Sequence, residues 1–325
     1  MASFRPFALL ADIGGTHVRC ALDLGDGTPP AQVKLVRADD YPDLAAVIRA
    51  YLTEVGGPVP HYAALAVAGP AIGDKITLTN RNWVFSQAEL GNDFGFEGMV
   101  CVNDFAAQAY ALAVLGPGDV EPVGGGVAVS GAPCVVIGPG TGLGVAGLIW
   151  VEGKPVPIGG EGGHASLAPI DAREAEILSI LRRRFGHVSA ERVLCGEGLC
   201  NLYHAVATMR GVTASPLSPQ AIAGEAGAND LATETLDLFF SFLGNAAGSL
   251  ALIFAARGGV YLAGGILPKL GAQLNASRFR ERFVSKGRFV AYLEAIPTRL
   301  VVAATPALGG LQAALRAADL KKTSD

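Results

Sequence analysis

Short runs of apolar residues recur along the chain, and many of them end at a glycine-rich turn. Runs of this kind, bounded by turn residues, are typical of strands that are buried on both faces of a sheet. The pattern predicts strands at residues 7–10, 62–68, 100–102, 134–137, 259–263 and 300–303. Residues 18–22 and 145–151 follow glycine turns and alternate, so each is predicted to be a further strand, with 7–10 and 18–22 forming a hairpin.

Apolar residues spaced three and four apart predict helices between these strands. The helical segments are 44–52, 105–115, 174–185, 191–209, 232–256 and 309–317. Residues 232–256 are nearly all apolar, which is typical of a helix at the centre of a domain. Because strands alternate with helices, the sequence predicts an α/β fold.

Two segments of the chain share one pattern. Each has an apolar strand, a glycine-rich turn that contains Gly-Thr, and a second strand-like run. Aligning Gly15-Thr16 with Gly140-Thr141 separates the copies by 125 residues (141 − 16), which is about the length of one domain. The spacing predicts an internal duplication.

The composition is that of a soluble globular protein with about two domains. Of 325 residues, 50% are hydrophobic, 17% are charged and 43 are glycine, and the net charge is −4. These values exclude a disordered or collagen-like chain. The longest basic block is Arg182-Arg183-Arg184, which argues against a nucleic-acid partner. We expect no signal peptide and no membrane span, because every apolar stretch of about 18 residues is interrupted by polar residues or glycine.

The cysteines show neither a CxxC pair nor a cysteine–histidine cluster with metal-binding spacing. Several of them lie in apolar, strand-like runs, where cysteine is usually a small core residue. We therefore expect reduced thiols, as in a cytoplasmic protein. They are Cys20, Cys101, Cys134, Cys195 and Cys200.

Three glycine turns follow predicted buried strands and are candidates for phosphate binding. Glycine lets the backbone approach a ligand, and its N–H groups can then face phosphate oxygens. Each could instead be a simple tight turn, although two contain threonine and the first contains aspartate. Known phosphate motifs do not explain them: no GxxxxGK(S/T) run occurs, and a GxGxxG match at 142–147 precedes a strand rather than a helix. The turns contain Asp12, Gly14, Gly15 and Thr16; Gly138, Gly140, Thr141 and Gly142; and Gly264 and Gly265.

Asn103 and Asp104 follow a predicted strand and precede a predicted helix. In open α/β sheets, ligands bind at the carboxyl ends of the strands. A carboxylate there can serve as a general base, and the amide beside it can bind a hydroxylated substrate. The alternative is that this pair only caps the helix.

Glu161 and His164 lie three residues apart in a segment too rich in glycine for a helix. A metal site could use such a pair, but no third ligand is visible nearby. Hydrogen-bonding side chains on a flexible loop suit a polyol better. Glu191 and Glu197 could each be only a favourable charge in the first turn of a helix.

Taken together, these residues make the chain resemble the bacterial-type glucokinases of the sugar kinase/hexokinase/actin superfamily. The matching strings occur in the family's order and cover nearly the whole chain. They are ADIGGTHVRCAL, TNRNWVFS, VNDFAAQAYAL, IGPGTGLGVA, GGEGGHASLAP, GHVSAERVL, VYLAGGI and FRERFVSKGRF.

The resemblance implies a two-domain actin/hexokinase-like (ribonuclease H-like) α/β fold with the site in an interdomain cleft. Residues 1–114 with 305–325 would form the small domain and 115–304 the large one. It also implies ATP-dependent phosphorylation of the glucose 6-hydroxyl with Mg²⁺, by a cytoplasmic homodimer at the start of glycolysis. Neither a nucleic acid nor a membrane is expected as a partner.

Residue roles carry over from the family by matched position. Asp104 matches the catalytic base, and Asn103, Glu161, His164 and Glu191 match sugar ligands. The first two glycine turns match the phosphate loops, with Asp12 near Mg²⁺, possibly through water, and Gly264 with Gly265 lies near the adenosine.

The chain departs from the family pattern at two places. Glu197 stands where proline is common, and His17 follows Thr16 where asparagine is frequent. The first change bears on sugar affinity, because it lies near Glu191. The alternatives are a kinase for another hexose or N-acyl-hexosamine and a non-catalytic sugar-binding regulator. The presence of Asp104, the start of the chain at the first phosphate loop and the lack of a zinc-binding cysteine cluster argue against the regulator.

Overall fold

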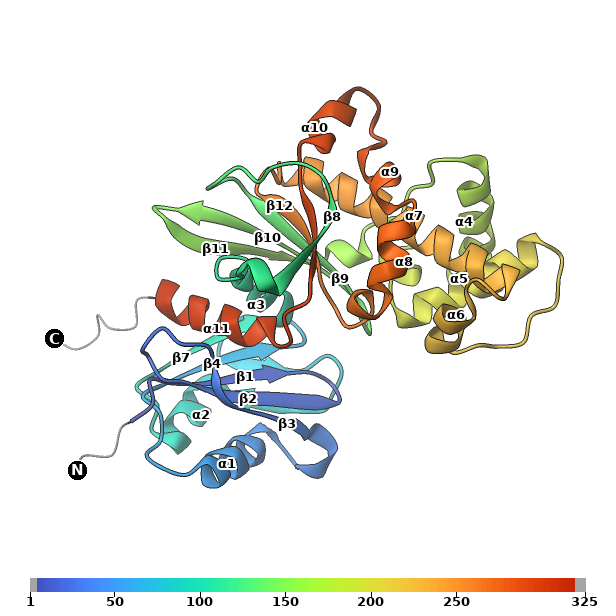
Figure 1. Cartoon of the computed structure of the whole chain (residues 1–325). Helices are drawn as coiled ribbons and strands as arrows, with labels where there is room; N and C mark the ends of the chain where they lie inside the picture. Colours follow the sequence, from blue (N-terminus) through green and yellow to red (C-terminus); the bar gives the residue numbers. More distant parts are fainter. Residues whose placement is uncertain (1–4, 319–325) are drawn as a thin grey trace. The chain divides into compact units, whose positions relative to one another are not determined.

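The computed structural model describes residues 5–318 and divides into two compact units (Figure 1). The first unit contains residues 5–115, Val151–Gly159 and 303–318, and the second contains Gly116–Trp150 and Gly160–Val302. The domain boundaries and the cleft expected from the sequence stay predictions. Residues 1–4 and 319–325 of the predicted small domain lie outside the described residues.

The first unit is built on a five-stranded sheet with the order β3-β2-β1-β4-β7. β1 runs antiparallel to β2 and parallel to β4, and β4 runs parallel to β7. A small antiparallel hairpin, β5-β6, accompanies it. The strands are β1 (Ala8–Ile13), β2 (His17–Asp23), β3 (Ala31–Arg37), β4 (Tyr62–Val67), β5 (Lys75–Thr77), β6 (Val84–Ser86) and β7 (Gly98–Asn103).

Alternation along β1 separates the two hydrophobic cores of this unit, because neighbouring side chains on a strand point to opposite faces. Leu9 and Ile13 pack with residues of α1 (Leu44–Val55), whereas Leu10 packs with residues of α3 (Asp104–Ala111) and α11 (Pro306–Ala317). The C-terminal helix thus belongs to the core of the first unit. α2 (Gln87–Phe94) completes its helices.

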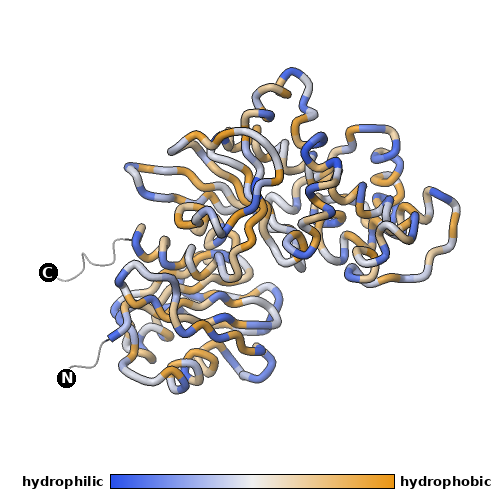
Figure 2. The backbone as a smooth tube through the Cα atoms, viewed as in Figure 1, coloured by the Kyte–Doolittle hydropathy of each residue, from blue (hydrophilic) through white to orange (hydrophobic). Residues whose placement is uncertain are grey.

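The second sheet has the order β11-β10-β9-β12-β13-β8. Apolar residues, orange in Figure 2, follow the strands of both sheets. The strands are β8 (Val120–Gly124), β9 (Cys134–Pro139), β10 (Leu143–Val151), β11 (Lys154–Gly160), β12 (Gly259–Leu262) and β13 (Thr298–Val301). The helices are α4 (Ala172–Phe185), α5 (Gly196–Met209), α6 (Pro219–Glu225), α7 (Asp230–Ile253), α8 (Gly271–Ala276), α9 (Phe279–Val284) and α10 (Val290–Glu294).

The two sheets repeat one topology. The order β3-β2-β1-β4-β7 corresponds strand by strand to β11-β10-β9-β12-β13. In each, a hairpin (β1-β2 or β9-β10) is antiparallel and its first strand lies parallel to the next strand of the sheet (β4 or β12). This arrangement confirms the internal duplication predicted from the two Gly-Thr turns.

α7 is the helix that the sequence placed at the centre of a domain. It is long and apolar enough to cross a membrane by length and composition, but 67% of its most apolar stretch is buried within the protein. It contributes Phe239, Phe240 and Phe242 to the largest hydrophobic core. Core helices of soluble proteins pass the same test of length and composition.

The predicted helix 191–209 is wrong at its start. α5 begins at Gly196, and Glu191 lies in a separate 3₁₀ turn, Ala190–Arg192. Cys195 is extended and caps α5, because its Sγ accepts a hydrogen bond from the Gly198 N–H at 3.2 Å. A Cβ at Gly198 would lie 2.5 Å from the backbone of Val193, so glycine permits this sharp turn.

All five cysteines are free thiols in the structure. Cys20 and Cys134 are buried, and Cys101 is partly buried. Burial raises the pKa of each of these three thiols to about 12. They are therefore unreactive core groups at neutral pH.

Candidate active site

The polar residues of the first unit gather at one edge of its sheet. β1, β4 and β7 are parallel, and their ends align because Ile13 pairs with Val67 and Val67 pairs with Asn103. Asp12 therefore lies at the same sheet edge as Asn103 and Asp104. These candidate residues therefore share one strand-end edge of the sheet, which is where ligands bind in open α/β sheets.

Asp12 is a half-buried carboxylate with a cationic partner. Its Oδ2 lies 3.1 Å from Nη1 of Arg19, which is the residue opposite it on β2. Burial raises the pKa of Asp12 above its usual value, and the Arg19 charge and hydrogen bond oppose this rise. Because burial is the larger effect, the charged form of this carboxylate is less stable than it would be on an open surface.

Asn103 and Asp104 mark the junction between β7 and α3. The Asn103 Oδ1 accepts from the Phe105 and Ala106 N–H groups at 2.9 and 3.3 Å, and its Nδ2 donates to the Gly69 carbonyl at 3.1 Å. Asn103 therefore caps α3. Asp104 is the first residue of α3, half-buried, and its Oδ1 accepts from the Phe105 N–H at 2.9 Å.

The turn between β1 and β2 contacts a residue that the sequence analysis did not single out. Arg81 donates from Nη1 to the Gly15 carbonyl at 3.0 Å and from Nη2 to Asp39 at 2.8 Å. Its guanidinium also stacks on the Trp83 ring, 4.5 Å from the centroid. The TNRNWVFS string contains Arg81, but only the structure shows its contact with the glycine turn.

In the second unit, Glu161, His164 and Glu191 lie together. His164 Nε2 is 3.9 Å from Glu161 Oε2, and His164 Nδ1 is 3.9 Å from Glu191 Oε1. Glu161 and His164 come from the glycine-rich segment that forms a 3₁₀ turn, Gly162–His164. A Cβ at Gly163 would lie 2.0 Å from the Leu143 carbonyl oxygen, so this turn packs directly on β10.

Glu191 also holds the second glycine turn. Its Oε2 accepts from the Leu143 N–H at 2.9 Å. A Cβ at Gly142 would lie 2.4 Å from this oxygen, so glycine is needed where the carboxylate approaches. On the other side, the Gly140 carbonyl accepts from the Gly196 N–H at 3.0 Å. The turn is therefore fixed between Glu191 and the start of α5.

The third glycine turn packs on the second. Gly264 has a φ of +84°, and a Cβ there would lie 2.3 Å from the Pro139 carbonyl oxygen. Gly265 lines a pocket of about 340 Å³ with residues of α5, α6 and the segment after β12. Other lining residues are Leu199, Pro219, Gln220, Ile266, Lys269 and Gln273.

The candidate residues thus form two groups, one in each unit. Asp12, Asn103 and Asp104 belong to the first, and the residues around Glu191 belong to the second. Within residues 5–318, no three His, Cys, Asp or Glu side chains form a cluster that could hold a metal ion. A protein-only metal centre at Glu161 and His164 is accordingly not part of the described structure.

Comparisons with known proteins decide the family. A family model described as glucokinase matches residues 9–318. The chain belongs to the glucokinase family. It is 47% identical over 307 residues to the glucokinase of Paramagnetospirillum magneticum, an alignment that covers 93% of this chain and 95% of that protein.

Two solved structures show the same fold. A glucokinase from an Antarctic psychrotroph is 38% identical with a TM-score of 0.88, over 95% of this chain and 98% of that one. A ROK family glucokinase from Streptomyces griseus, solved with glucose and AMPPNP, is 18% identical with a TM-score of 0.62, over 95% and 98% of the chains. The family, the two-domain actin/hexokinase-like fold class and the kinase activity expected from the sequence are confirmed, and the alternatives are not favoured.

Proposed function

We propose that this glucokinase-family enzyme transfers the γ-phosphoryl group of ATP to the 6-hydroxyl of D-glucose. The observation that carries this proposal is the grouping of Glu161, His164 and Glu191 beside a glycine turn. It places carboxylate and imidazole groups, which bind hydroxyls, next to backbone amides, which bind phosphates. A relative that is 47% identical to this chain over nearly its whole length is named glucokinase.

Asp104 is proposed as the general base. It lies at the start of α3 and at a strand-end edge, and it is half-buried. A carboxylate in this position can orient the 6-hydroxyl and accept its proton as the phosphoryl group is transferred. Asn103, which also caps α3, is proposed to bind the sugar.

The proposed sugar ligands of the second unit are Glu161, His164 and Glu191. Their exposed fractions are 75%, 60% and 32%, so their polar atoms are accessible to a ligand. One oxygen of Glu191 is engaged by Leu143. Since the same carboxylate contacts the turn at Gly142, we infer that it links sugar binding to the geometry of the phosphate site.

The nucleotide is assigned to the three glycine turns. As a member of a kinase family, the enzyme uses ATP. We propose that Asp12, Gly14, Gly15 and Thr16 and the residues Gly138, Gly140, Thr141 and Gly142 surround the phosphates. The base and ribose would occupy the pocket at Gly265, whose volume of about 340 Å³ is in the range of small-molecule sites.

Magnesium fits the residues that are present. Mg²⁺ keeps several waters and is usually held by one or two carboxylates together with substrate phosphates. Asp12 supplies one such carboxylate beside the first turn. The ion would neutralise charge on the transferred phosphoryl group, and we propose that Asp12 holds it, either directly or through a water molecule.

Finer properties of the enzyme are proposed from its family. These are a cytoplasmic location, a role at the start of glycolysis, and a homodimer without nucleic-acid or membrane partners. Light scattering on the eluting peak of a sizing column tests the dimer directly.

The experiment for the function is an ADP-release assay over a panel of hexoses and N-acyl-hexosamines, with and without Mg²⁺. We expect glucose to have the highest kcat/KM and Mg²⁺ to be required. Equal or higher kcat/KM with another sugar would replace glucose as the substrate. No ADP release with any sugar would overturn the kinase assignment.

A further inference from the structure

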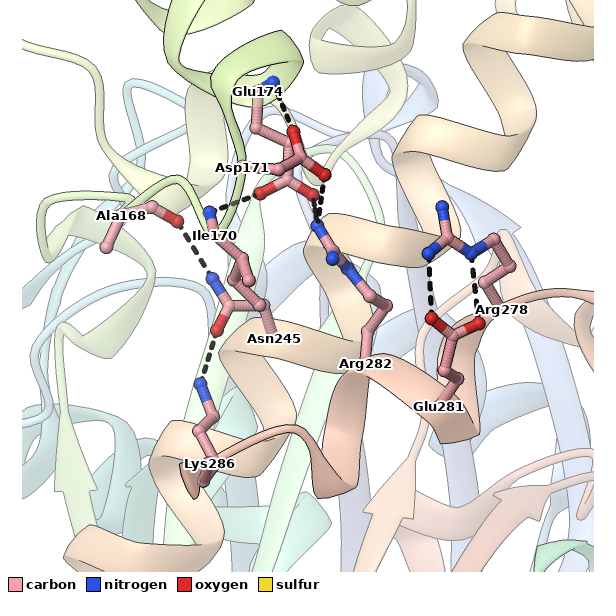
Figure 3. Close-up of polar contacts among 9 residues, drawn as sticks. All are labelled: Ala168, Ile170, Asp171, Glu174, Asn245, Arg278, Glu281, Arg282 and Lys286. Carbon is pink, nitrogen blue, oxygen red and sulfur yellow. Dashed lines mark hydrogen bonds and ion pairs between the residues drawn. The ribbon is translucent and has the colours of Figure 1, made fainter. Parts of the chain in front are cut away.

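Two cationic side chains in the FRERFVSKGRF segment lie against the part of the second unit that carries the proposed sugar ligands. Arg282 belongs to α9 and is buried, whereas Lys286 lies two residues after the end of α9 and is partly buried. Both side chains reach polar groups of α4 and α7 (Figure 3). The phosphoryl-transfer mechanism uses neither residue.

Two glycines of α7 allow α9 to come close. A Cβ at Gly244 would lie 2.2 Å from the Phe279 carbonyl oxygen, and one at Gly248 would lie 2.3 Å from that of Phe283. Any other residue at either position would force the helices apart. Because Gly244 and Gly248 are one turn apart on α7, they form the surface on which α9 presents Arg282 and Lys286.

Lys286 makes the first connection to residues 161–170, the loop that begins with the proposed ligands Glu161 and His164. Its Nζ donates to Asn245 Oδ1 and, at 2.9 Å, to Ser249 Oγ. Asn245 in turn donates from Nδ2 to the Ala168 carbonyl at 2.8 Å. The lysine therefore fixes the orientation of the amide that holds the loop (Figure 3).

Arg282 makes the second connection. Its Nη2 contacts Glu174 Oε1 and Asp171 Oδ2, the latter at 3.2 Å. Glu174 accepts from the Ile170 N–H through its other oxygen at 2.7 Å. Arg282 and Glu174 are 5% and 0% exposed, so removing Arg282 would leave the Glu174 charge buried and unpaired.

A cavity of about 170 Å³ lies behind the same loop. Gly162, Ser166 and Ala168 line it on the loop side, and Asn245 and Ser249 line it from α7. A loop over a cavity has few packing contacts to fix its position on that side. The hydrogen bonds at Ala168 and Ile170 therefore help to hold the loop in place on that side.

Movement of this loop would displace Glu161, His164 and Glu191, the proposed sugar ligands of the second unit. The loop pairs with the segment before Glu191, since the Ala190 N–H donates to the Ala165 carbonyl at 2.9 Å and the Leu167 N–H donates to the Val188 carbonyl at 3.1 Å. Glu161 and His164 lie at the start of the loop itself.

We propose that Arg282 and Lys286 are positioning residues that set the place of Glu161, His164 and Glu191 for the sugar. The proposal rests on the proposed function, because it assumes that these three residues bind glucose. It assigns the cations no contact with substrate. They act through Asn245 and Glu174.

The test compares Lys286→Met with a matched control at the other end of α9, Arg278→Met. Methionine keeps the length of the lysine stem but cannot donate to Asn245. Arg278 pairs with Glu281 on the exposed side (Figure 3). For Lys286→Met we expect KM for glucose to rise about tenfold or more, with KM for ATP within about twofold and kcat changed less than KM for glucose. The control should match wild type.

Hydrogen exchange on the free enzyme gives a readout that does not depend on activity. Faster exchange of the amides in 161–170 is expected in Lys286→Met and not in Arg278→Met. Asn245→Ala breaks the same connection from the other side and replaces Lys286→Met if that variant does not fold. Unchanged KM for glucose with unchanged exchange, or equal changes in both KM values, would overturn the proposal.

The two proposals fail in different ways. If wild type does not phosphorylate glucose, the proposed function is wrong, and with it the sugar to which the positioning refers. If wild type phosphorylates glucose but Lys286→Met lowers only the thermal midpoint, the function stands and the positioning role is wrong.

Discussion

The two sheets share one strand order over five strands, but the residues beside their first turns differ in charge. In the first unit, the end of β1 carries Asp12, just before the turn, and Asp12 pairs with Arg19 across the hairpin. In the second unit, the matching turn after β9 contains only glycine, proline and threonine. Its acidic partner, Glu191, comes from a separate segment and binds the Leu143 N–H.

This difference shows what the repeated topology supplies and what is added to it. The shared topology supplies two tight turns whose backbone amides can approach phosphates. The added side chains divide the work: we assign charge and proton transfer to the first unit and sugar recognition mainly to the second. Fold and chemistry are thus specified by different residues.

The largest expected effect comes from Asp104→Asn in the first unit. Asparagine keeps the shape and can still accept the Phe105 N–H bond, so folding should change little. It cannot accept a proton, and kcat should fall about 10²–10⁴-fold. Turnover is measured alongside the thermal midpoint. A folded variant with more than about a tenth of wild-type turnover would contradict the role of base.

The second-unit ligands should behave differently. Alanine at Glu161, His164 or Glu191 leaves a hydroxyl of bound glucose without its partner, which costs on the order of 1–3 kcal/mol. The specificity constant for glucose should therefore fall about tenfold to a hundredfold in each variant. If all three variants show wild-type glucose kinetics, the sugar site lies elsewhere.

The next prediction tests the contact between Glu191 and the second glycine turn. In Gly142→Ala the added methyl group would lie 2.4 Å from Glu191 Oε2 and displace it from Leu143. We expect kcat/KM to fall about tenfold, close to the loss of one hydrogen bond to a charged group. Wild-type kcat/KM in Gly142→Ala would show that the contact of Glu191 with Leu143 does not support the turn.

The smallest effect concerns stability, and it should appear only in the first turn. Burial raises the pKa of Asp12, so the folded protein binds this proton more tightly than the unfolded chain does. The resulting stabilisation is fully present below the ordinary pKa and is lost as pH rises through the raised one. Asp12→Asn should accordingly be more stable than wild type at neutral pH, with the difference shrinking as pH falls toward 4.

Urea unfolding at several pH values measures this difference, and Thr141→Val in the second turn is the uncharged counterpart. Its stability difference from wild type should not depend on pH. A destabilised Asp12→Asn at neutral pH would mean that the Arg19 ion pair outweighs the burial of the carboxylate.

The sequence predicted most of the buried framework. The apolar runs that became β1, β4, β9 and β12 are fully or nearly fully buried, and burial on both faces is what makes such runs recognisable. Segments on the surface gave a weaker signal. β3, at the edge of its sheet, is mostly exposed, and it was not predicted although Ala31, Val33 and Leu35 alternate with polar residues.

The sequence predicted candidate residues for the site, but it did not predict which residues contact one another. The string around Glu191 was visible, yet the helix predicted there began too early, because Gly198 allows a tight turn that apolar spacing does not reveal. Contacts between distant segments, such as Arg81 with Gly15 and Lys286 with Asn245, have no local sequence signature. They depend on which elements the fold brings together.

Glucose titration by calorimetry of Asp104→Asn beside Glu191→Ala tests the division of labour most directly. The account predicts that Asp104→Asn binds glucose within about tenfold of wild type, or about 1.4 kcal/mol, although its turnover is lost. Glu191→Ala should bind glucose more weakly than Asp104→Asn does. Weak glucose binding by Asp104→Asn together with wild-type binding by Glu191→Ala would contradict the account.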